Sequence, residues 1–190
     1  MKKYDVIVIG AGPAGYAAAM RAVDFKKKVA LIEKKQVGGA GIHHGALWSK
    51  TWWELSREAA NIRKHSDALN IHQYQFNYET LKNEVKAAVQ ERMELLEHHM
   101  HNINVTIGEG LFEFIMGNAK VISRNQVHVH NFDSDEILEA DNIIVATGSR
   151  PRLLPELPID EEHVFTSDGL DKLDHFPKSI VIVGAGVIGC

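Results

Sequence analysis

Residues 4–33, YDVIVIGAGPAGYAAAMRAVDFKKKVALIE, decide the fold of this chain. The apolar run over residues 6–9 consists of valine and isoleucine and stops at Gly10, which is typical of a strand buried on both faces. A helix is expected to begin near Pro13, because proline fits the first helical turn. Residues 29–32 then read as a second strand that ends at Glu33. This order predicts a parallel strand-helix-strand unit.

Three glycines stand between the first strand and the helix at the spacing G-x-G-x-x-G. Gly10 lets the chain turn off the strand, Gly12 leaves room for a pyrophosphate beside the backbone, and Gly15 lets the helix pack closely on the strand. The free N–H groups and the positive end of the helix would face the pyrophosphate. Glu33 can accept hydrogen bonds from a ribose diol and would repel a 2′-phosphate. The dinucleotide-binding residues predicted here are Gly10, Gly12, Pro13, Ala14, Gly15, Glu33 and Lys34.

A secretory signal is the alternative interpretation of this segment, because Lys2 and Lys3 precede an uncharged stretch over residues 6–20. Asp5 immediately precedes that stretch, and three glycines and a proline interrupt it. These residues exclude a signal-like core, and the stretch is also too short to span a membrane. We therefore expect neither a leader nor a membrane partner.

The composition is typical of a globular protein without a nucleic-acid partner. The chain has 190 residues, 45% of them hydrophobic, and a net charge of −4. This balance offers no strongly basic surface for nucleic acid. Cys190 is the only cysteine, so no disulfide framework is expected, which fits a cytoplasmic location.

A second glycine-rich segment, KKQVGGAGIHHGALWSK, occupies residues 34–50. So many glycines indicate backbone packed tightly against a neighbour, here the cofactor. The segment resembles the pattern G-G-T-C-x-x-x-G-C-x-P-S-K of the FAD-dependent pyridine nucleotide-disulfide oxidoreductases, which include dihydrolipoamide dehydrogenase. The positions that match this pattern are Gly38, Gly39, Gly45, Ser49 and Lys50. The resemblance implies FAD as cofactor, with Gly39 and Lys50 beside it.

The departures from the family pattern bear on the chemistry. The two family cysteines, which form a redox disulfide beside the flavin, fall on Gly41 and Ala46, and neither residue can form a thiolate. His43 and His44 are candidate proton donors near a reduced flavin. Alternatively, they fill the space of the absent cysteines or point to solvent. No catalytic residue is assigned.

The middle of the chain is expected to contain two helices and several short strands. Residues 47–65 read as a helix, and residues 79–100 read as an amphipathic helix with Asn77 as N-cap, its apolar stripe packing in the core. His98, His99 and His101 are assigned to a solvated helix end, and no metal site is expected. A strand over residues 104–107 would lead to Gly110, where the family's backbone reaches the adenine.

A small antiparallel β meander is expected next, built from residues 112–115, 120–123, 126–130 and 136–139. Residues 142–146 read as another buried strand of the main sheet. This strand leads into an A-T-G-x-x-P element that matches the family closely. The resemblance therefore adds Ala146, Thr147 and Gly148 to the FAD-binding residues.

The end of the chain repeats the dinucleotide fingerprint. A helix capped near Thr166 is expected to run through Leu173, and residues 179–183 read as a strand. Gly184, Gly186 and Gly189 then match the glycine spacing again, which the resemblance assigns to an NAD(P)-binding domain. The predicted organisation is an FAD-binding domain over residues 1–150, a linker over 151–177 and the truncated start of the NAD(P) domain over 178–190. We expect the polypeptide to continue beyond Cys190.

Two functional hypotheses follow. The first is an FAD-dependent oxidoreductase that passes electrons from NADH or NADPH to the flavin and directly to an unknown small-molecule acceptor, without a disulfide relay. The family resemblance implies a homodimer for the complete protein. The alternative is a non-catalytic FAD- or ADP-binding module, or a truncated remnant.

Overall fold

The structure is a computed structural model that describes residues 1–71, 73–108, 110–131 and 135–189. The chain divides into two compact units. The first unit contains residues Met1–His43 and Glu91–Ser149, and the second contains His44–Gln90 and Arg150–Cys190.

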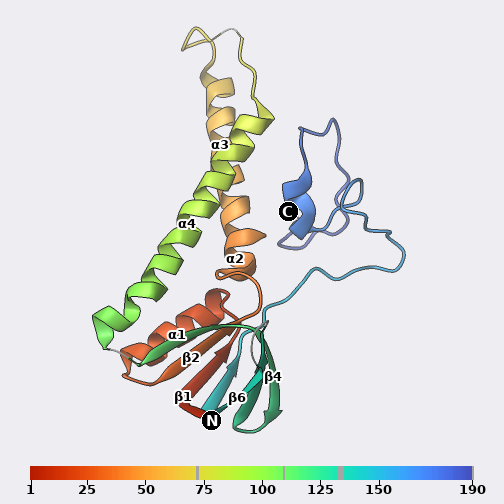
Figure 1. Ribbon diagram of the computed structural model, residues 1–190. Coiled ribbons are helices and arrows are strands. Elements are labelled where there is room, and N and C mark those ends of the chain that lie inside the picture. The colour runs from red at the N-terminus through yellow and green to blue at the C-terminus, as the bar shows by residue number, and fades with distance from the viewer. Residues whose placement is uncertain (72, 109, 132–134, 190) are drawn as a thin grey trace. The chain divides into compact units, whose positions relative to one another are not determined.

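The first unit is built on one six-stranded sheet with the strand order β3-β2-β1-β6-β5-β4 (Figure 1). The four strands β3, β2, β1 and β6 are parallel, while β4, β5 and β6 form an antiparallel edge. The fold is therefore of the predicted mixed α/β class, with a Rossmann-like parallel sheet and an appended meander. The strands are β1 (Lys2–Ile9), β2 (Val29–Glu33), β3 (Phe112–Met116), β4 (Asn118–Ser123), β5 (Gln126–His130) and β6 (Asp135–Val145).

The meander differs from the expected one in two respects. Residues 112–115 do not belong to it, because β3 pairs in parallel with β2 along its whole length. The segments expected separately at 136–139 and 142–146 form one strand, β6, which pairs with β5 at its start and with β1 from Leu138 onwards. Because β6 has partners on both sides, it continues from the meander into the parallel sheet without a turn.

Helices cover one face of this sheet. Helix α1 (Pro13–Asp24) packs along β1 and β2 (Figure 1), and the C-terminal part of α4 (Tyr78–Ile107) joins the same core cluster. The opposite face has a second core cluster, in which residues of the meander pack on the parallel strands. The first cluster is Val8, Ala11, Ala19, Val23, Val29, Leu31, Val37, Met100, Ile103 and Phe112, and the second is Tyr4, Ile7, Ile9, Ala30, Ile32, Ile115, Val127, Val129, Leu138 and Ala140.

Helix α4 is longer than its sequence pattern predicted. Asn77 caps it, since its side-chain oxygen accepts a hydrogen bond from the Thr80 N–H at 3.0 Å. The strand predicted over residues 104–107 is wrong, because these residues continue the helix. Ile103 and Ile107 extend the helical stripe of Met100 into the core, and this burial outweighs the β-branched composition of the segment.

In the second unit, α3 (Ala46–His65) and the short helix η1 (Ser167–Lys172) match the predicted helices. The Thr166 side chain caps η1 by accepting a hydrogen bond from the Asp168 N–H at 3.3 Å. Tyr78 joins these elements, because its ring stacks on Trp52 and its hydroxyl donates to the Leu173 carbonyl at 3.0 Å.

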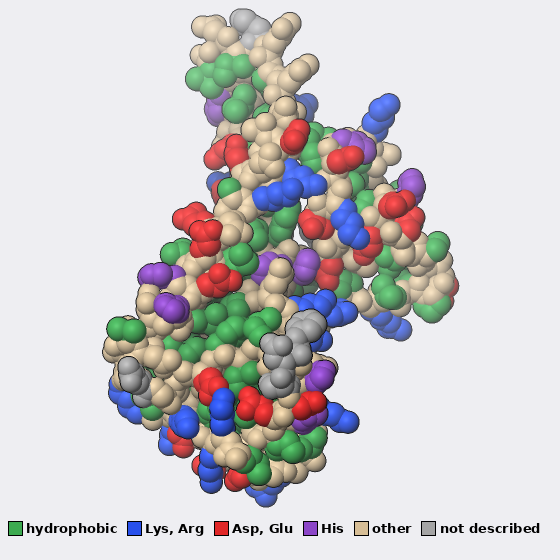
Figure 2. Space-filling model, viewed as in Figure 1, with side chains coloured by type: hydrophobic (Ala, Val, Ile, Leu, Met, Phe, Trp, Pro, Cys, Tyr) green, Lys and Arg blue, Asp and Glu red, His purple; other side chains and the backbone are tan. Residues whose placement is uncertain are grey.

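The strand predicted over residues 179–183 does not form. An isolated strand leaves its backbone N–H and C=O groups without partners, and none of the described residues pairs with this segment. Its side chains are correspondingly exposed, Val181 by 90%. None of the helices in the described parts of the chain is both long enough and apolar enough to cross a membrane. On the visible face, Lys and Arg side chains are interspersed with Asp and Glu side chains (Figure 2).

Candidate dinucleotide site

The glycine loop between β1 and α1 is shaped by two close backbone contacts. Gly10 has a φ of 102°, and a Cβ at this position would lie 2.4 Å from the Ala146 carbonyl oxygen. A Cβ at Gly15 would lie 1.8 Å from the Gly10 carbonyl oxygen. Real Cβ atoms do not come this close to other heavy atoms, so both positions require glycine. The loop therefore brings β1, α1 and the end of β6 together.

Gly12 is different, because its missing side chain faces open space. Among the described residues, no atom lies within 4 Å of a Cβ built at this position. Gly12 is the N-cap of α1, and Pro13 is the first helical residue. Since the Tyr16 N–H donates to the Gly12 carbonyl, the preceding amides of Ala14 and Gly15 have no acceptor within the helix. The space above this helix end can receive an anion.

Glu33 holds the loops on either side of this space. Its Oε2 accepts a hydrogen bond from the Ala11 N–H at 2.8 Å. Its Oε1 accepts from the N–H groups of Lys34 and Lys35 at 2.9 Å each. A carboxylate has about four lone-pair positions, so it can accept a further hydrogen bond. Glu33 both shapes the site and keeps the capacity to bind a hydroxyl group.

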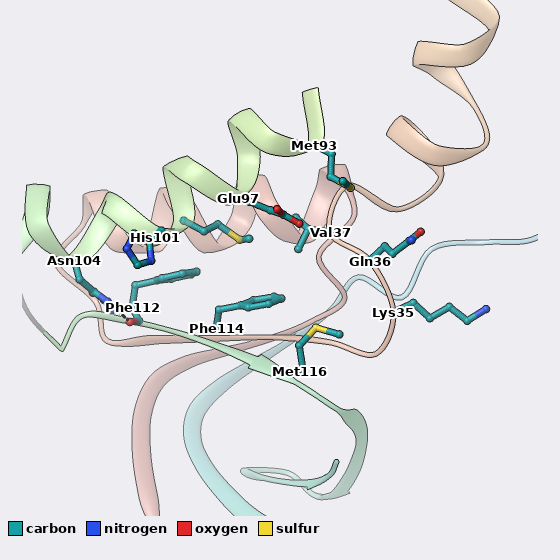
Figure 3. Close-up of a pocket in the computed structure, with 11 residues that line it drawn as sticks. Lys35, Gln36, Val37, Met93, Glu97, His101, Asn104, Phe112, Phe114 and Met116 are labelled. Carbon is teal, nitrogen blue, oxygen red and sulfur yellow. Dashed lines mark hydrogen bonds between the residues drawn. The ribbon is translucent and has the colours of Figure 1, made fainter. Parts of the chain in front are cut away.

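A pocket of about 550 Å³ lies between β3 and α4 on the same side of the sheet, and it extends along β3 from Phe112 to Met116 and to the residues that follow β2. Met116 lines it and pairs in register with Glu33. Both side chains point to the face covered by α4, because Leu31 and Phe114, two residues earlier in each strand, belong to that core cluster. Figure 3 shows the rings of Phe112 and Phe114 between β3 and α4. The lining residues are Lys35, Gln36, Val37, Met93, Glu97, Met100, His101, Asn104, Phe112, Phe114 and Met116.

This pocket is not predictable from the pattern of the sequence. Met93 and Met100 lie one heptad apart on α4, and their stripe was assigned to core packing alone. Asn104 closes one end of the pocket, because its side-chain amide donates to the Phe112 carbonyl at 2.8 Å and accepts from the Phe112 N–H at 3.1 Å. The only sequence signal was the excess of methionine on one face of the helix, which suits an adaptable apolar surface.

The short helix α2 (Gly39–His43) packs on the glycine loop. A Cβ at Gly39 would lie 3.1 Å from Gly12 Cα, and a Cβ at Gly41 would lie 2.5 Å from Pro13 Cγ. The imidazole Nε2 of His43 donates to the Val37 carbonyl at 2.8 Å. His43 therefore fastens α2 to the segment that follows β2.

Other predicted cofactor residues follow β6. Ala146 donates its N–H to the Ile9 carbonyl at 2.8 Å, and Gly148, after Thr147, has a φ of 72°. They lie at the carboxyl end of the parallel strands, as Gly10 does. Gly110 lies elsewhere: the Val29 N–H donates to the Leu111 carbonyl at 2.7 Å, which fixes this segment at the amino end of β2. Gly110 therefore does not lie at the carboxyl end of the parallel strands, where the glycine loop lies.

The remaining predicted residues belong to the second unit. Lys50 is exposed on α3. Gly184 has a φ of 111°, and a Cβ at Gly189 would lie 2.2 Å from the Gly184 carbonyl oxygen. The first fingerprint has the same relationship between Gly15 and Gly10. Gly186 accepts a hydrogen bond from the Gly189 N–H at 3.0 Å, so these residues form a turn, and no strand precedes it in the described segment. Cys190 lies outside the described residues.

The histidines of α4 do not lie at a helix end, as had been expected, because the helix continues to Ile107. His98 contacts the side chain of Asn102, and His99 Nδ1 hydrogen-bonds the Tyr16 hydroxyl of α1. His101 lines the pocket. Within the described ranges, no three His, Cys, Asp or Glu side chains are grouped so that they could hold a metal ion.

Known proteins match this chain over its whole length. The family model described as pyridine nucleotide-disulphide oxidoreductase matches residues 4–190. A dihydrolipoyl dehydrogenase of Chlamydia pneumoniae is 34% identical over 191 residues, which are 100% of this chain and 39% of the relative. A soluble pyridine nucleotide transhydrogenase of Hahella chejuensis is 32% identical, over 99% of this chain and 40% of the relative. The chain thus spans about 40% of the length of these relatives.

Solved structures agree with these matches. The structure of LpdA from Mycobacterium tuberculosis superposes with a TM-score of 0.80 at 25% identity, over 100% of this chain and 41% of that protein. A copper(II) complex of the HOCl-induced flavoprotein disulfide reductase RclA from Escherichia coli gives a TM-score of 0.77 at 23% identity, over 100% of this chain and 38% of that one. The second likeness concerns the fold alone.

Proposed function

The chain belongs to the pyridine nucleotide-disulphide oxidoreductases, and from that premise we propose that it forms the FAD-binding part of an NAD(P)H oxidoreductase. The family uses FAD and a nicotinamide nucleotide. The observation that carries the proposal is the glycine loop. Backbone atoms fill the space beside Gly10 and Gly15, whereas the space beside Gly12, at the N-terminus of α1, is free of described protein atoms. A pyrophosphate would lie beside Gly12, at the N-terminus of α1.

The residues around the loop fit FAD. The amides of Ala14 and Gly15 would bind the pyrophosphate, and Glu33 would accept a hydrogen bond from the ribose. Gly39, Ala146, Thr147 and Gly148 would let the backbone pass close to the cofactor. When bound, FAD supplies the electron-transfer chemistry, while the protein binds and orients it.

The pocket beside Glu33 supports a position for the adenine. Because Glu33 and Met116 are register partners on one face, a ribose bound by Glu33 would carry its base next to the pocket. The apolar floor of Phe114 and Met116 suits a planar ring, and Gln36 at the rim offers an amide to its polar edge. Gly110 is not needed for this contact.

Electrons leave the flavin without passing through a disulfide in the proposed reaction. Gly41 and Ala46 occupy the positions of the redox cysteines in the family pattern, and neither contains sulfur. The acceptor must then react with the flavin directly, which is possible for a quinone, another nicotinamide, a small oxidant or oxygen. The chain itself supplies no electron carrier at these positions.

The organisation of the complete protein is part of the proposal. Residues 1–150 would belong to the FAD domain and residues 151–177 to a linker. Residues 178–190 would begin an NAD(P) domain whose phosphate loop contains Gly184, Gly186 and Gly189. Lys50 would approach the flavin. By analogy with the family, the complete protein would be a cytoplasmic homodimer.

A non-catalytic FAD- or ADP-binding module is the second candidate. It is considered because the residues assigned in this chain would bind a dinucleotide, and none of them is assigned a catalytic role. Stopped-flow reduction of the complete flavoprotein by NADH and NADPH distinguishes the two functions, followed by an anaerobic screen of acceptors. We expect one nucleotide to bleach the flavin absorbance and lipoamide to be a poor acceptor. No flavin reduction by either nucleotide would favour the module, and rapid lipoamide turnover would contradict the absence of a disulfide relay.

A further inference from the structure

Gly41 lies in contact with the glycine loop, and its own backbone conformation does not explain why it is glycine. Its φ is not among the positive values found in this chain, and it lies inside α2. Helix propensity alone would favour alanine at such a position. The explanation is space, because an added Cβ would lie 2.5 Å from Pro13 Cγ and 3.4 Å from Pro13 Cδ.

Neither partner in this contact can move away easily. The proline ring is closed onto its own backbone and cannot rotate aside as a long side chain does. Helix α2 is held by the hydrogen bond from His43 to Val37 and by that from the Gly38 N–H to the Ala11 carbonyl, both 2.8 Å long. Ile42 is buried, with 7% of its surface exposed. A side chain at position 41 would therefore push on the loop.

We propose that Gly41 is a positioning residue for the dinucleotide: its lack of a side chain lets α2 hold Pro13, and with it the open position at Gly12, in the geometry that binds the pyrophosphate. This inference rests on the proposed function for the identity of the ligand. It adds that position 41 serves as a packing contact against Pro13 in this chain.

The test uses the complete protein and measures two quantities for each variant, the Kd for FAD and the melting temperature of the apoprotein. We expect Gly41→Ala to raise the Kd about tenfold or more, since a displaced loop misaligns the amides that face the pyrophosphate. Gly41→Cys should weaken binding at least as much. The matched control is Ala40→Cys, which places the same thiol on the exposed neighbouring residue of α2 and should leave the Kd unchanged.

The contact itself is tested by a double-mutant cycle. Pro13→Ala removes Cγ and Cδ, the two atoms nearest to the added Cβ. In the Pro13→Ala background, adding Gly41→Ala should therefore cause little further loss of FAD affinity. A role in stability alone would lower the melting temperature and leave the affinity of the folded protein unchanged. Nearly equal FAD affinities of Pro13→Ala and the double variant also separate displacement of the loop from general misfolding.

The outcomes separate this inference from the proposed function. If the wild-type protein binds neither FAD nor ADP, the proposed function is wrong, and the role of Gly41 in positioning a dinucleotide is wrong with it. If the wild type binds FAD but Gly41→Ala binds it equally well, only the inference is overturned. A loss of affinity that persists unchanged in the Pro13→Ala background overturns it as well.

Discussion

Glu33 Oε2 accepts a hydrogen bond from the backbone N–H of Ala11 at 2.8 Å, so the acid at the end of β2 directly holds the loop that follows β1. The other oxygen of Glu33 accepts from two further amides. A residue predicted from sequence as a ribose ligand is therefore also a structural element of the glycine loop. Substitutions of Glu33 should affect stability and cofactor binding together.

Glu33→Gln should lower the free energy of unfolding of the apoprotein by about 2 kcal/mol, since hydrogen bonds to a charged acceptor are worth about 1.5–3 kcal/mol. The glutamine NH₂ group cannot accept hydrogen bonds, so at least one of the three amides loses its partner. Urea unfolding measures the loss, and a flavin titration should show weaker FAD binding. Lys34→Ala, which keeps the carboxylate and the backbone amide that bonds it, is the control for the unfolding measurement alone. Equal stability of Glu33→Gln and wild type would contradict the structural role.

Gly12→Val should abolish FAD binding without unfolding the protein. No described atom lies within 4 Å of a Cβ at this position, so the added side chain meets the space for the phosphate and not the protein. The expected result is a melting temperature of the apoprotein close to that of the wild type, with FAD affinity reduced at least a hundredfold. If the variant binds flavin with unchanged affinity, the pyrophosphate does not bind at this loop.

Gly15→Ala, in the same motif, should destabilise the apoprotein, in contrast to Gly12→Val. Its Cβ would lie 1.8 Å from the Gly10 carbonyl oxygen, a backbone atom that cannot move without separating α1 from β1. Overpacking of this kind costs about 1–3 kcal/mol, so the apoprotein itself should be destabilised in urea unfolding. Normal stability of Gly15→Ala would mean that α1 can shift freely on the sheet.

The strand-helix-strand unit was predictable because its requirements are local. Gly15 is explained by its contact with Gly10 in the same short segment, and Gly10 by the positive φ of the turn. Only the contact of Gly10 with Ala146, after the neighbouring parallel strand, comes from a distant part of the chain. The strand predicted at residues 104–107 was wrong because the alternative depended on tertiary contacts. Ile103 and Ile107 find the core only if the helix continues, and a local pattern does not contain that information.

The candidate site was predictable only in part, for the same physical reason. The loop residues follow from glycine spacing, whereas the pocket depends on the register that places Met116 opposite Glu33. The packing of Gly41 on Pro13 depends on the path of the chain between β2 and α2. The position of Gly110 at the other end of the sheet depends on which residues of its segment pair with β2.

Glu113 should make the stability of the first unit depend on pH in the acid range. Burial alone would raise its pKa, but hydrogen bonds from Lys2 at 2.6 Å and Tyr4 at 2.5 Å outweigh burial and hold the pKa below the usual 4.5. A carboxyl group with a lowered pKa in the folded state contributes stability at neutral pH. That contribution begins to fall as the pH drops below about 4.5 and is lost as the pH passes through the folded-state pKa.

Glu113→Gln should therefore unfold at lower urea concentration than the wild type at pH 7, and the difference should shrink towards pH 3. The control is Glu139→Gln on β6, whose ion pair with Lys3 is exposed and 3.7 Å long, so it should have little effect at either pH. If the difference in unfolding midpoint, in urea, between Glu113→Gln and wild type stays constant from pH 7 to pH 3, the stabilising effect of Glu113 does not depend on its charge.

Met93→Trp should weaken the binding of ADP and FAD by filling the pocket from α4 (Figure 3), if the pocket receives the adenine. The matched control is Leu95→Trp on the same helix, because Leu95 is 54% exposed and does not line the pocket. Isothermal titration with ADP measures the effect, for which we expect about a tenfold rise in Kd, since base stacking contributes about 1–3 kcal/mol. Equal affinities of Met93→Trp and Leu95→Trp would place the adenine outside the pocket.

Oxidation of Met116 tests the same contact in the unmutated protein. Met116 is 46% exposed and lines the pocket, whereas Met1 is 78% exposed and does not. Dilute peroxide converts accessible methionine to the sulfoxide, and peptide mass spectrometry follows each site separately. Saturating ADP should slow oxidation at Met116 and leave the rate at Met1 unchanged, because only Met116 lies beside the carboxylate that would hold the ribose. If ADP binds but both methionines oxidise at their original rates, Glu33 still holds the ribose while the base points away from β3, and the proposed adenine position must be abandoned.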